Sequence, residues 1–427
     1  MGCHMPYRAA LLAVVFAPLL AACSDGGSDG SGKGGHGTTT SSTSTTSGTG
    51  GGGTGGGGGA TGTPSHIRVG QFNLREMTTK KLMDAADEQA TAAAEVLARF
   101  APDVVNINEL QYDIQGVPTS SSPGQPKADA KPGTFGGAAE NAKRLADRVR
   151  GVDPTADYPY VIQTLGNSGF LWEGSNNGSA VFDLRGWGEW RGRFNTAILS
   201  KWPILEDQIR VIADFAWEDL PDNLIAQMET EQGLTVPQGW PLFEKCLNVI
   251  PVQIGDEVVH FVLLHPVTPV YDVINTYRNH DELHALQLFL EGKLPGVDPL
   301  PEGAKYVVIG DLNADPEDGD GIEGSIQQVL DHPGLTAFFP EGHGTKYSNG
   351  ARNTYLGGCG LDDGSTVDDP TTHFQLQLDY LLPSKTLGTP TGGEVFFPDF
   401  KTAKDDFDLA CRASDHRFVY EEIDLAK

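Results

Sequence analysis

The sequence predicts a four-layer α/β/β/α sandwich, in which two mixed, mainly antiparallel sheets pack face to face and helices cover the outside. Short runs rich in β-branched residues alternate with helical stretches between residues 66 and 427. Several neighbouring runs follow one another closely, as in antiparallel meanders, which argues against a parallel, doubly wound sheet. No second linker or internal repeat interrupts this part of the chain, so we expect one domain over residues 66–427.

The expected strands are short apolar runs bounded by polar or turn-forming residues. In chain order they are IRVGQFNL (67–74), DVVNINEL (103–110), NTAILSKWPI (195–204), CLNVIPVQI (246–254), VVHFVLLHP (258–266), KYVVIGDLN (305–313), QLQLDYLLPS (375–384) and HRFVYEEI (416–423). Helices are expected at 79–102, 138–151 and 278–294, where apolar residues recur at helical spacing. Segments 114–137 and 212–241 look like insertions. The second carries Trp217 and Trp240, for which core packing is favoured over a role in covering a site.

The first 65 residues predict export and anchoring. Residues 1–22 have the form of a signal peptide, with Arg8 before an apolar run too short to span a membrane comfortably. The run ends in Leu20-Ala21-Ala22-Cys23, which resembles a bacterial lipobox and implies a lipid on Cys23; a plain secretory signal is the alternative. Residues 23–65 are mainly Gly, Ser and Thr and predict a flexible tether.

These features place the protein in the cell envelope, anchored to a membrane through Cys23, in the outer membrane if the cell is Gram-negative. An extracellular location is the alternative. Because such compartments are oxidising, disulfides are expected. We expect Cys359 to pair with Cys411 and Cys246 to be buried.

The formal net charge of -27 restricts the classes of partner. An acidic surface repels phosphate backbones at long range, which argues against tight non-specific binding of nucleic acid. Nucleic acid stays open as a substrate, because a bound divalent cation can bring a phosphate in locally. We expect a monomer.

Side chains that can bind a metal or carry a proton stand at the ends of the apolar runs. Any one of them alone is more often a turn former or a satisfied polar group. Together they adjoin core strands that could converge at one mouth of the sandwich, where binding and catalytic groups are commonly found. They are Asn73, Glu109, His265, Asp311, Asn313, Asp379, Asp415 and His416.

The acidic loop after residue 310 raises the question of a calcium site. DLNADPEDGDGI begins like an EF-hand loop, but Pro316 occupies the position of the required Gly and Ile322 that of the bidentate Glu. The run before it predicts a strand and not a helix. The calcium interpretation therefore fails, and most acids from Asp315 onward are expected to be solvated.

The order of these motifs resembles the endonuclease/exonuclease/phosphatase superfamily, the deoxyribonuclease-I-like proteins. The matching segments are QFNLRE, PDVVNINEL, FNTAILSKWPI, LLHPVTP, GDLNADPEDGD, LDYLLPS and ASDHRFV, in family order from residue 67 to residue 419. GDLNAD followed by SDH before a strand is a specific combination, although each motif alone is weak. The two insertions and the acidic surface depart from the family pattern and leave the substrate open.

The resemblance implies a metal-dependent phosphoesterase. Glu109 would be the main ligand of a divalent cation, and Asn73 and Asp415 would complete the site. Oxygen ligands of this kind suit Mg²⁺, with Mn²⁺ or Ca²⁺ as alternatives.

The resemblance also implies catalytic roles. Asp311 would orient and deprotonate the attacking water, while Asn313 and His265 would donate hydrogen bonds to phosphoryl oxygens. His416, oriented by Asp379, would contact the scissile phosphate. These residue types suit the chemistry, because phosphate-ester hydrolysis needs an aligned water and groups that stabilise charge on the phosphoryl oxygens.

Four further residues are weaker candidates for substrate binding. Arg193 and Asn195 precede an expected strand, where an Arg could bind a phosphate or form a surface ion pair. Arg278 and Asn279 stand at an expected helix start soon after the HPVTP segment. Asp281, by contrast, is expected to cap that helix.

Three functions stay open. The first is a phosphoesterase outside the cytoplasm, acting on a nucleotide, a sugar or inositol phosphate, or a phospholipid headgroup. The second is an extracellular nuclease on DNA or RNA, which predicts a basic or aromatic track that the sequence does not clearly contain. The third is a surface-anchored binding module that keeps only the fold. Loss of Glu109, Asp311 or His416 would favour it, but all three are present.

Overall fold

The computed structural model describes residues 62–120, 130–136, 140–174, 180–343, 350–359 and 374–426. The expected signal peptide, the lipidation site Cys23 and nearly all of the tether lie outside these residues. Within the described ranges, no helix is both long enough and apolar enough to cross a membrane.

The described residues form fourteen strands and seven α-helices. The strands are β1 (His66–Met77), β2 (Val104–Leu110), β3 (Thr134–Gly136), β4 (Tyr160–Leu165), β5 (Asn195–Ser200), β6 (Arg210–Ile212), β7 (Leu247–Ile254), β8 (Glu257–Leu263), β9 (Lys305–Asp311), β10 (Tyr355–Leu356), β11 (Gln375–Leu376), β12 (Asp379–Pro383), β13 (Gly388–Val395) and β14 (Val419–Leu425). The helices are α1 (Thr79–Met83), α2 (Glu88–Phe100), α3 (Glu140–Val152), α4 (Ile225–Gln232), α5 (Asn275–Leu290), α6 (Gln327–Leu330) and α7 (Lys404–Ala413).

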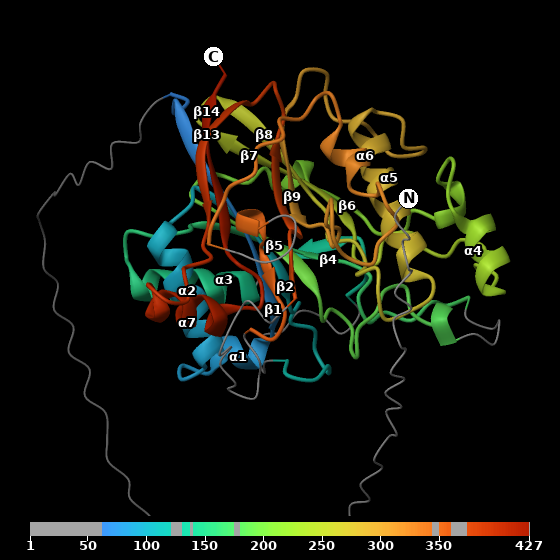
Figure 1. Cartoon of the computed structure of the whole chain (residues 1–427), viewed down its shortest axis with the longest axis horizontal. Coiled ribbons are helices and arrows are strands. Elements are labelled where there is room, and N and C mark those ends of the chain that lie inside the picture. The colour runs from blue at the N-terminus through green and yellow to red at the C-terminus, as the bar shows by residue number, and fades with distance from the viewer. Residues whose placement is uncertain are drawn as a thin grey trace, which may run out of the picture. The chain divides into compact units, whose positions relative to one another are not determined.

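The strands form two sheets that pack face to face, with helices outside (Figure 1). One sheet has the order β13-β14-β1-β2-β5-β4-β3 and the other β12-β9-β8-β7-β6, while β10 and β11 form a separate pair. Within the two sheets, pairing is antiparallel except between β1 and β2 and between β8 and β9. This arrangement confirms the predicted mixed, mainly antiparallel sandwich.

Apolar side chains fill the space between each pair of layers. Helices α2, α3 and α7 lie together on one side of the molecule and α5 on the other (Figure 1). Leu97 and Leu145 of the first group pack with the outer face of the seven-stranded sheet, and Leu286 of α5 packs with the five-stranded sheet. Between the sheets lies a third cluster that includes Val69, Ile198, Phe261 and Ile309. Burial of these side chains fixes the strand registers, since a one-residue slip would turn each of them outward.

Several elements differ in extent from the sequence prediction. The stretch 79–102 forms two helices, because Asp87 caps α2 by accepting a hydrogen bond from the N–H of Ala90 at 2.8 Å. The predicted strand 375–384 divides into β11 and β12, and α5 begins at Asn275. Asp281 therefore lies inside α5 and is not a cap. Its buried carboxylate instead accepts from the indole N–H of Trp217 at 2.6 Å and from the N–H of Leu224 at 2.8 Å.

The cysteines and the two tryptophans lie as the sequence predicts. Cys359 and Cys411 form a disulfide, and Cys246 is a buried free thiol. Trp217 and Trp240 are both almost fully buried in the apolar cluster under α5. The segment that carries them is thus part of the core on that side of the sandwich.

One buried carboxyl group lies among the apolar side chains between the sheets. Glu421 on β14 shares the inward face of Val419 and Ile423, which belong to the cluster between the sheets. Its side chain is fully buried, and neither carboxyl oxygen has a hydrogen-bond partner among the described residues. Burial raises the pKa of Glu421 well above its usual range. The folded protein therefore holds a proton that the unfolded chain releases above a pH of about 4.3.

Replacing this group tests that conclusion. Because the wild-type pKa is raised on folding, its free energy of unfolding falls, relative to that of Glu421→Gln, as pH rises above the unfolded pKa. The difference should grow by up to about 1.4 kcal/mol per pH unit. Urea denaturation of both proteins at pH 5, 6 and 7 measures it. The exposed Glu95→Gln is the control, and a difference that is constant across these pH values would contradict the prediction.

Candidate active site

The residues singled out at the strand ends meet where the two sheets open at one edge. Asn73 pairs with Asn108 in the parallel ladder of β1 and β2, so Glu109 follows directly on the neighbouring strand. In the other sheet, Asp379 pairs with Asp311. Acidic side chains from both sheets therefore lie at the same edge of the sandwich.

A local distortion of β2 directs Glu109 into the site. The pairing of β2 with β5 shifts register between Ile107 and Leu110, and Glu109 has a φ of 61°. Such left-handed backbone is uncommon for a residue other than glycine, and bulges of this kind often re-aim a side chain beside an active site. The Glu109 carboxylate accepts from the N–H of Glu76 at 3.0 Å. Burial raises the pKa of Glu109, and the negative charge of Asp415 raises it further.

The side-chain amide of Asn73 lies between the buried carboxylate of Asp311 and the partly exposed carboxylate of Glu109. Its Nδ2 donates to Glu109 Oε1 at 3.1 Å and to Asp311 Oδ2 at 2.8 Å, and its Oδ1 accepts from the N–H of Arg75 at 2.9 Å. With the amide in this orientation, Asn73 holds the two carboxylates together. Direct ligation of a metal by its oxygen would require the amide to turn over.

Asp311 is the most buried acid at the mouth. Its Oδ1 accepts from the N–H of Asn313 at 2.9 Å, and its Oδ2 lies 3.5 Å from His265 Nε2 and 3.7 Å from His416 Nε2. Burial raises the pKa of Asp311, although the positive charge of His416 opposes the rise. The preceding Gly310 allows β9 to lie close to the backbone at Leu264, because a Cβ at position 310 would lie 1.9 Å from the carbonyl oxygen of Leu264.

The surroundings of the two histidines shift their pKa values in opposite directions. His416 Nδ1 lies 2.7 Å from Asp379 Oδ2. Burial lowers the pKa of His416, but the charges of Asp379 and Asp311 outweigh burial and the net pKa is raised. For His265, burial and then the positive charges of Lys245 and His416 lower the pKa well below its usual range. The site therefore combines a charged imidazolium with a neutral imidazole.

The donor set fits a hard divalent cation. Atoms of Glu109, His265 and Asp311 lie within 4.8 Å of one another, and Asp415 lines the same cavity. Asp415 Oδ2 also lies 3.4 Å from Arg75 Nε. Neighbouring carboxylate oxygens are a suitable environment for a divalent cation, since the cation would offset their repulsion.

The structure engages Arg193 and Asn195 with protein groups. Arg193 forms ion pairs with Glu76 and with Glu189, the latter at 3.2 Å, and its guanidinium packs over the rings of Trp187, Trp190 and Phe194. Asn195 is buried and accepts from the N–H of Gly166 at 2.7 Å. Their roles in substrate binding stay predictions.

Arg278 and Asn279 hold the walls of the site together. Arg278 donates to the carbonyl oxygens of Leu242 and Arg185, both at 2.7 Å, and lies over the ring of Trp240. Asn279 Nδ2 donates to the carbonyl oxygen of Val267 at 2.8 Å. Arg278 also lines the cavity, and its contact with a substrate stays a prediction.

A cavity of about 1130 Å³ is lined by most of these residues, but not by Asn73 or Asp379. The acidic loop that follows β9 forms part of its rim, and there Asp315 is not simply solvated. Its carboxylate accepts from the N–H groups of Glu317, Asp318 and Gln377 at 2.7–2.8 Å and so shapes the loop. Glu244 and Lys245 are among the lining residues that sequence reasoning missed. Nothing in a Glu-Lys pair ahead of a strand distinguishes it from ordinary surface charge.

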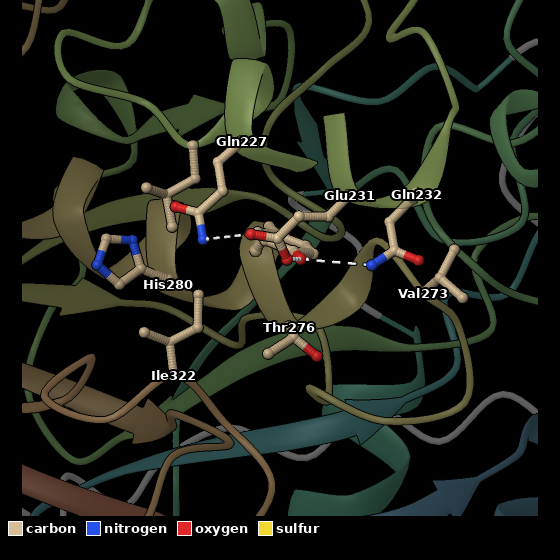
Figure 2. Close-up of a pocket in the computed structure, with 9 residues that line it drawn as sticks. Gln227, Glu231, Gln232, Val273, Thr276, His280 and Ile322 are labelled. Atoms are coloured by element: carbon tan, nitrogen blue, oxygen red, sulfur yellow. Dashed lines mark hydrogen bonds between the residues drawn. The ribbon is translucent and has the colours of Figure 1, made fainter. Parts of the chain in front are cut away.

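A second, smaller pocket of about 500 Å³ lies between α4 and α5 (Figure 2). Its polar groups satisfy one another: Gln227 donates to Glu231 at 2.9 Å, and Gln232 donates to the Tyr277 hydroxyl at 3.4 Å. Tyr277 in turn donates to Glu231 at 2.5 Å. This pocket lacks the converging acids and imidazoles of the larger cavity, which is the candidate active site.

Removing the charge of Asp379 should change the state of His416. Because that carboxylate raises the pKa of His416, Asp379→Asn should lower the midpoint of the His416 titration by about one to three pH units. The ring resonances of His416, followed by NMR against pH, measure the midpoint. The exposed His66 in the same spectra is the internal control. An unchanged midpoint for His416 would show that Asp379 does not set its charge.

Comparison with solved structures gives distant likenesses. An endonuclease/exonuclease/phosphatase from Beutenbergia cavernae DSM 12333 is 18% identical with a TM-score of 0.46, over 85% of this chain and 72% of that chain. A beta toxin from Staphylococcus aureus is 16% identical with a TM-score of 0.42, over 83% and 99%. TDP2 from Caenorhabditis elegans is 13% identical with a TM-score of 0.41, over 84% and 74%. No curated protein matches the sequence closely enough to indicate a relative.

The match to a protein family is extensive. The model of the Endonuclease/Exonuclease/phosphatase family covers residues 70–416, which includes each of the acids and histidines of the cavity edge described above. The chain belongs to the endonuclease/exonuclease/phosphatase family, whose members are hydrolases acting on phosphate esters.

Proposed function

We propose that the protein is a metal-dependent phosphoesterase that hydrolyses phosphate mono- or diesters outside the cytoplasm. The observation that carries this proposal is the placement of Asp311. It lies hydrogen-bonded through Asn73 to Glu109 and within 3.7 Å of two imidazoles, one neutral and one charged. A base, a cation site and hydrogen-bond donors for an anion therefore share one cavity.

The protein groups divide the work of hydrolysis among them. Asp311 accepts the proton of the attacking water, and the N–H of Asn313 holds the other carboxylate oxygen in place. The imidazolium of His416 donates to phosphoryl oxygens, and its bond to Asp379 fixes the ring. His265 and the side-chain amide of Asn313 are further donors.

Glu109 would hold a divalent cation, with Asp415 as a second oxygen ligand and Mg²⁺ as the expected ion. When bound, the cation would neutralise charge on the phosphate and on the leaving oxygen. One amide, that of Asn73, holds Glu109 and Asp311 close together, an arrangement that favours uptake of a cation.

A panel assay tests the activity. A phosphomonoester, a phosphodiester, plasmid DNA and a phospholipid are each incubated with the purified protein in Mg²⁺, Mn²⁺ or Ca²⁺, and in excess EDTA. We expect hydrolysis of at least one substrate with a divalent cation and none in EDTA, because the substrate charge is then not neutralised. Full turnover in EDTA would contradict the metal proposal, and cleavage of plasmid DNA alone would favour the nuclease alternative.

Asp311→Asn is the matched control in this assay. It keeps the shape of the side chain but removes the base, so the rate should fall by about 10² to 10⁴-fold while the circular dichroism spectrum stays unchanged. Equal activity of the variant and the wild type would remove Asp311 from the mechanism. A folded wild-type protein that is inactive on every substrate and cation would favour the binding-module alternative.

We propose further that a lipid on Cys23 anchors the enzyme in the cell envelope. The lipobox-like LAAC and the Gly-, Ser- and Thr-rich segment behind it support this proposal. Cys23→Ser removes the thiol that would carry the lipid. The variant should move from the membrane fraction to the soluble fraction after cell breakage. Cys3→Ser, in the same signal segment, is the control and should not. Membrane association of Cys23→Ser would contradict lipid anchoring.

A further inference from the structure

Lys245 is a buried cation at the edge of the sheet where the catalytic residues gather. It lies two residues before β7, and its exposed fraction is only 7%. Asn248 of β7 pairs with Leu263 of β8, so extending that register places Lys245 beside the segment that carries His265. Lys245 also lines the same cavity as Glu109, His265 and Asp311.

Among the described residues, Lys245 has one partner, the adjacent Glu244. Lys245 Nζ is paired with Glu244 Oε2, and Glu244 is itself buried and lines the cavity. The backbone N–H of Glu244 donates to Glu282 of α5, which also accepts from the N–H of Val267 at 2.6 Å. One carboxylate therefore ties the Lys245 segment to the loop that follows His265. A buried ion pair is weak support for stability, because desolvation offsets the attraction, so stability alone does not account for this pair.

The other cationic side chains of the cavity are more fully engaged. Arg278 donates to three backbone carbonyl oxygens and stacks on Trp240, and Arg75 lies against Asp415. An ammonium group has three donors, and among the described residues Lys245 uses one of them, on Glu244. Its charge also reaches the catalytic groups, since it lowers the pKa of both Glu109 and His265.

We propose that Lys245 binds a non-bridging oxygen of the substrate phosphate next to His265. This inference rests on the proposed phosphoesterase activity. His265 Nε2 lies 3.5 Å from Asp311 on that side of the cavity, and Lys245, which lines the same cavity, supplies a fixed positive charge there. A fixed cation aimed at a phosphoryl oxygen in a cavity of low dielectric contributes on the order of 10² to 10³-fold in rate.

The experiment compares Lys245→Met with Glu244→Gln. Two quantities are measured: kcat/KM on the best substrate of the panel, and the affinity for inorganic phosphate by isothermal titration calorimetry. Lys245→Met should lose about 10²-fold or more in kcat/KM and should bind phosphate more weakly. Glu244→Gln, which keeps the ammonium group, should keep phosphate binding within a few-fold of the wild type. Lys245→Arg should rescue phosphate affinity in part.

Two further variants separate this contact from a structural effect. Lys201 is a half-buried lysine that pairs with Asp103 and donates to the carbonyl oxygen of Ala101, and it does not line the cavity. Lys201→Met should therefore leave both measurements unchanged. If Lys245→Met alone does not fold because Glu244 is left unpaired, Glu244→Gln/Lys245→Met removes both charges and is compared with Glu244→Gln.

The outcomes are distinguishable. Equal losses in Lys245→Met and Glu244→Gln, or wild-type phosphate affinity without Lys245, would overturn the contact while leaving the phosphoesterase intact. An inactive wild-type protein would overturn the proposed function instead. In that case, phosphate binding that depends on Lys245 but not on Glu244 would still support an anion contact by Lys245.

Discussion

The site depends on one amide group placed between two acids that would otherwise repel each other. Asn73 comes from the centre of the seven-stranded sheet, and it donates both to Glu109 on the adjacent strand and to Asp311 on the opposite sheet. At the mouth, the two packed sheets are therefore joined by a hydrogen bond between Asn73 and Asp311. A buried carboxylate such as Asp311 beside a second, partly exposed one is tolerated only when hydrogen bonds, a neighbouring positive charge or a cation offsets the cost of burial. The same requirement makes the place suitable for an anionic substrate accompanied by a metal.

The contrast between the two histidines shows how burial and neighbours set charge together. Both rings are buried, and burial lowers the pKa of each because it disfavours the charged form. His416 has a carboxylate directly on Nδ1, whereas the Nδ1 of His265 has no partner among the described residues. The environment therefore gives identical side chains different tasks, one as a charged donor and the other as a neutral one.

Much of the fold and the identity of the mouth residues could be predicted from sequence, because strand periodicity and motif order are local signals. Glu109, Asp311 and His416 each end or precede an apolar run, and that pattern is visible without a structure. Contacts that depend on three-dimensional packing were not visible. Asp281 was expected to be a cap because helix starts favour Asp, but the helix begins earlier and the carboxylate binds Trp217. Lys245 was overlooked because its burial follows from the path of the chain before β7, and a lone lysine carries no spacing signal.

The disulfide joins two segments that both reach the catalytic edge. Cys411 belongs to α7, shortly before Asp415 and His416, and Cys359 follows the short strand whose Tyr355 bridges to His416. The N–H of Leu356 also donates to the carbonyl oxygen of Asp415 at 2.9 Å. The covalent link therefore restrains the backbone on both sides of His416. The disulfide forms in an oxidising compartment and is reduced in a reducing one. The order of the candidate active site is therefore coupled to the redox state of the compartment that the protein occupies.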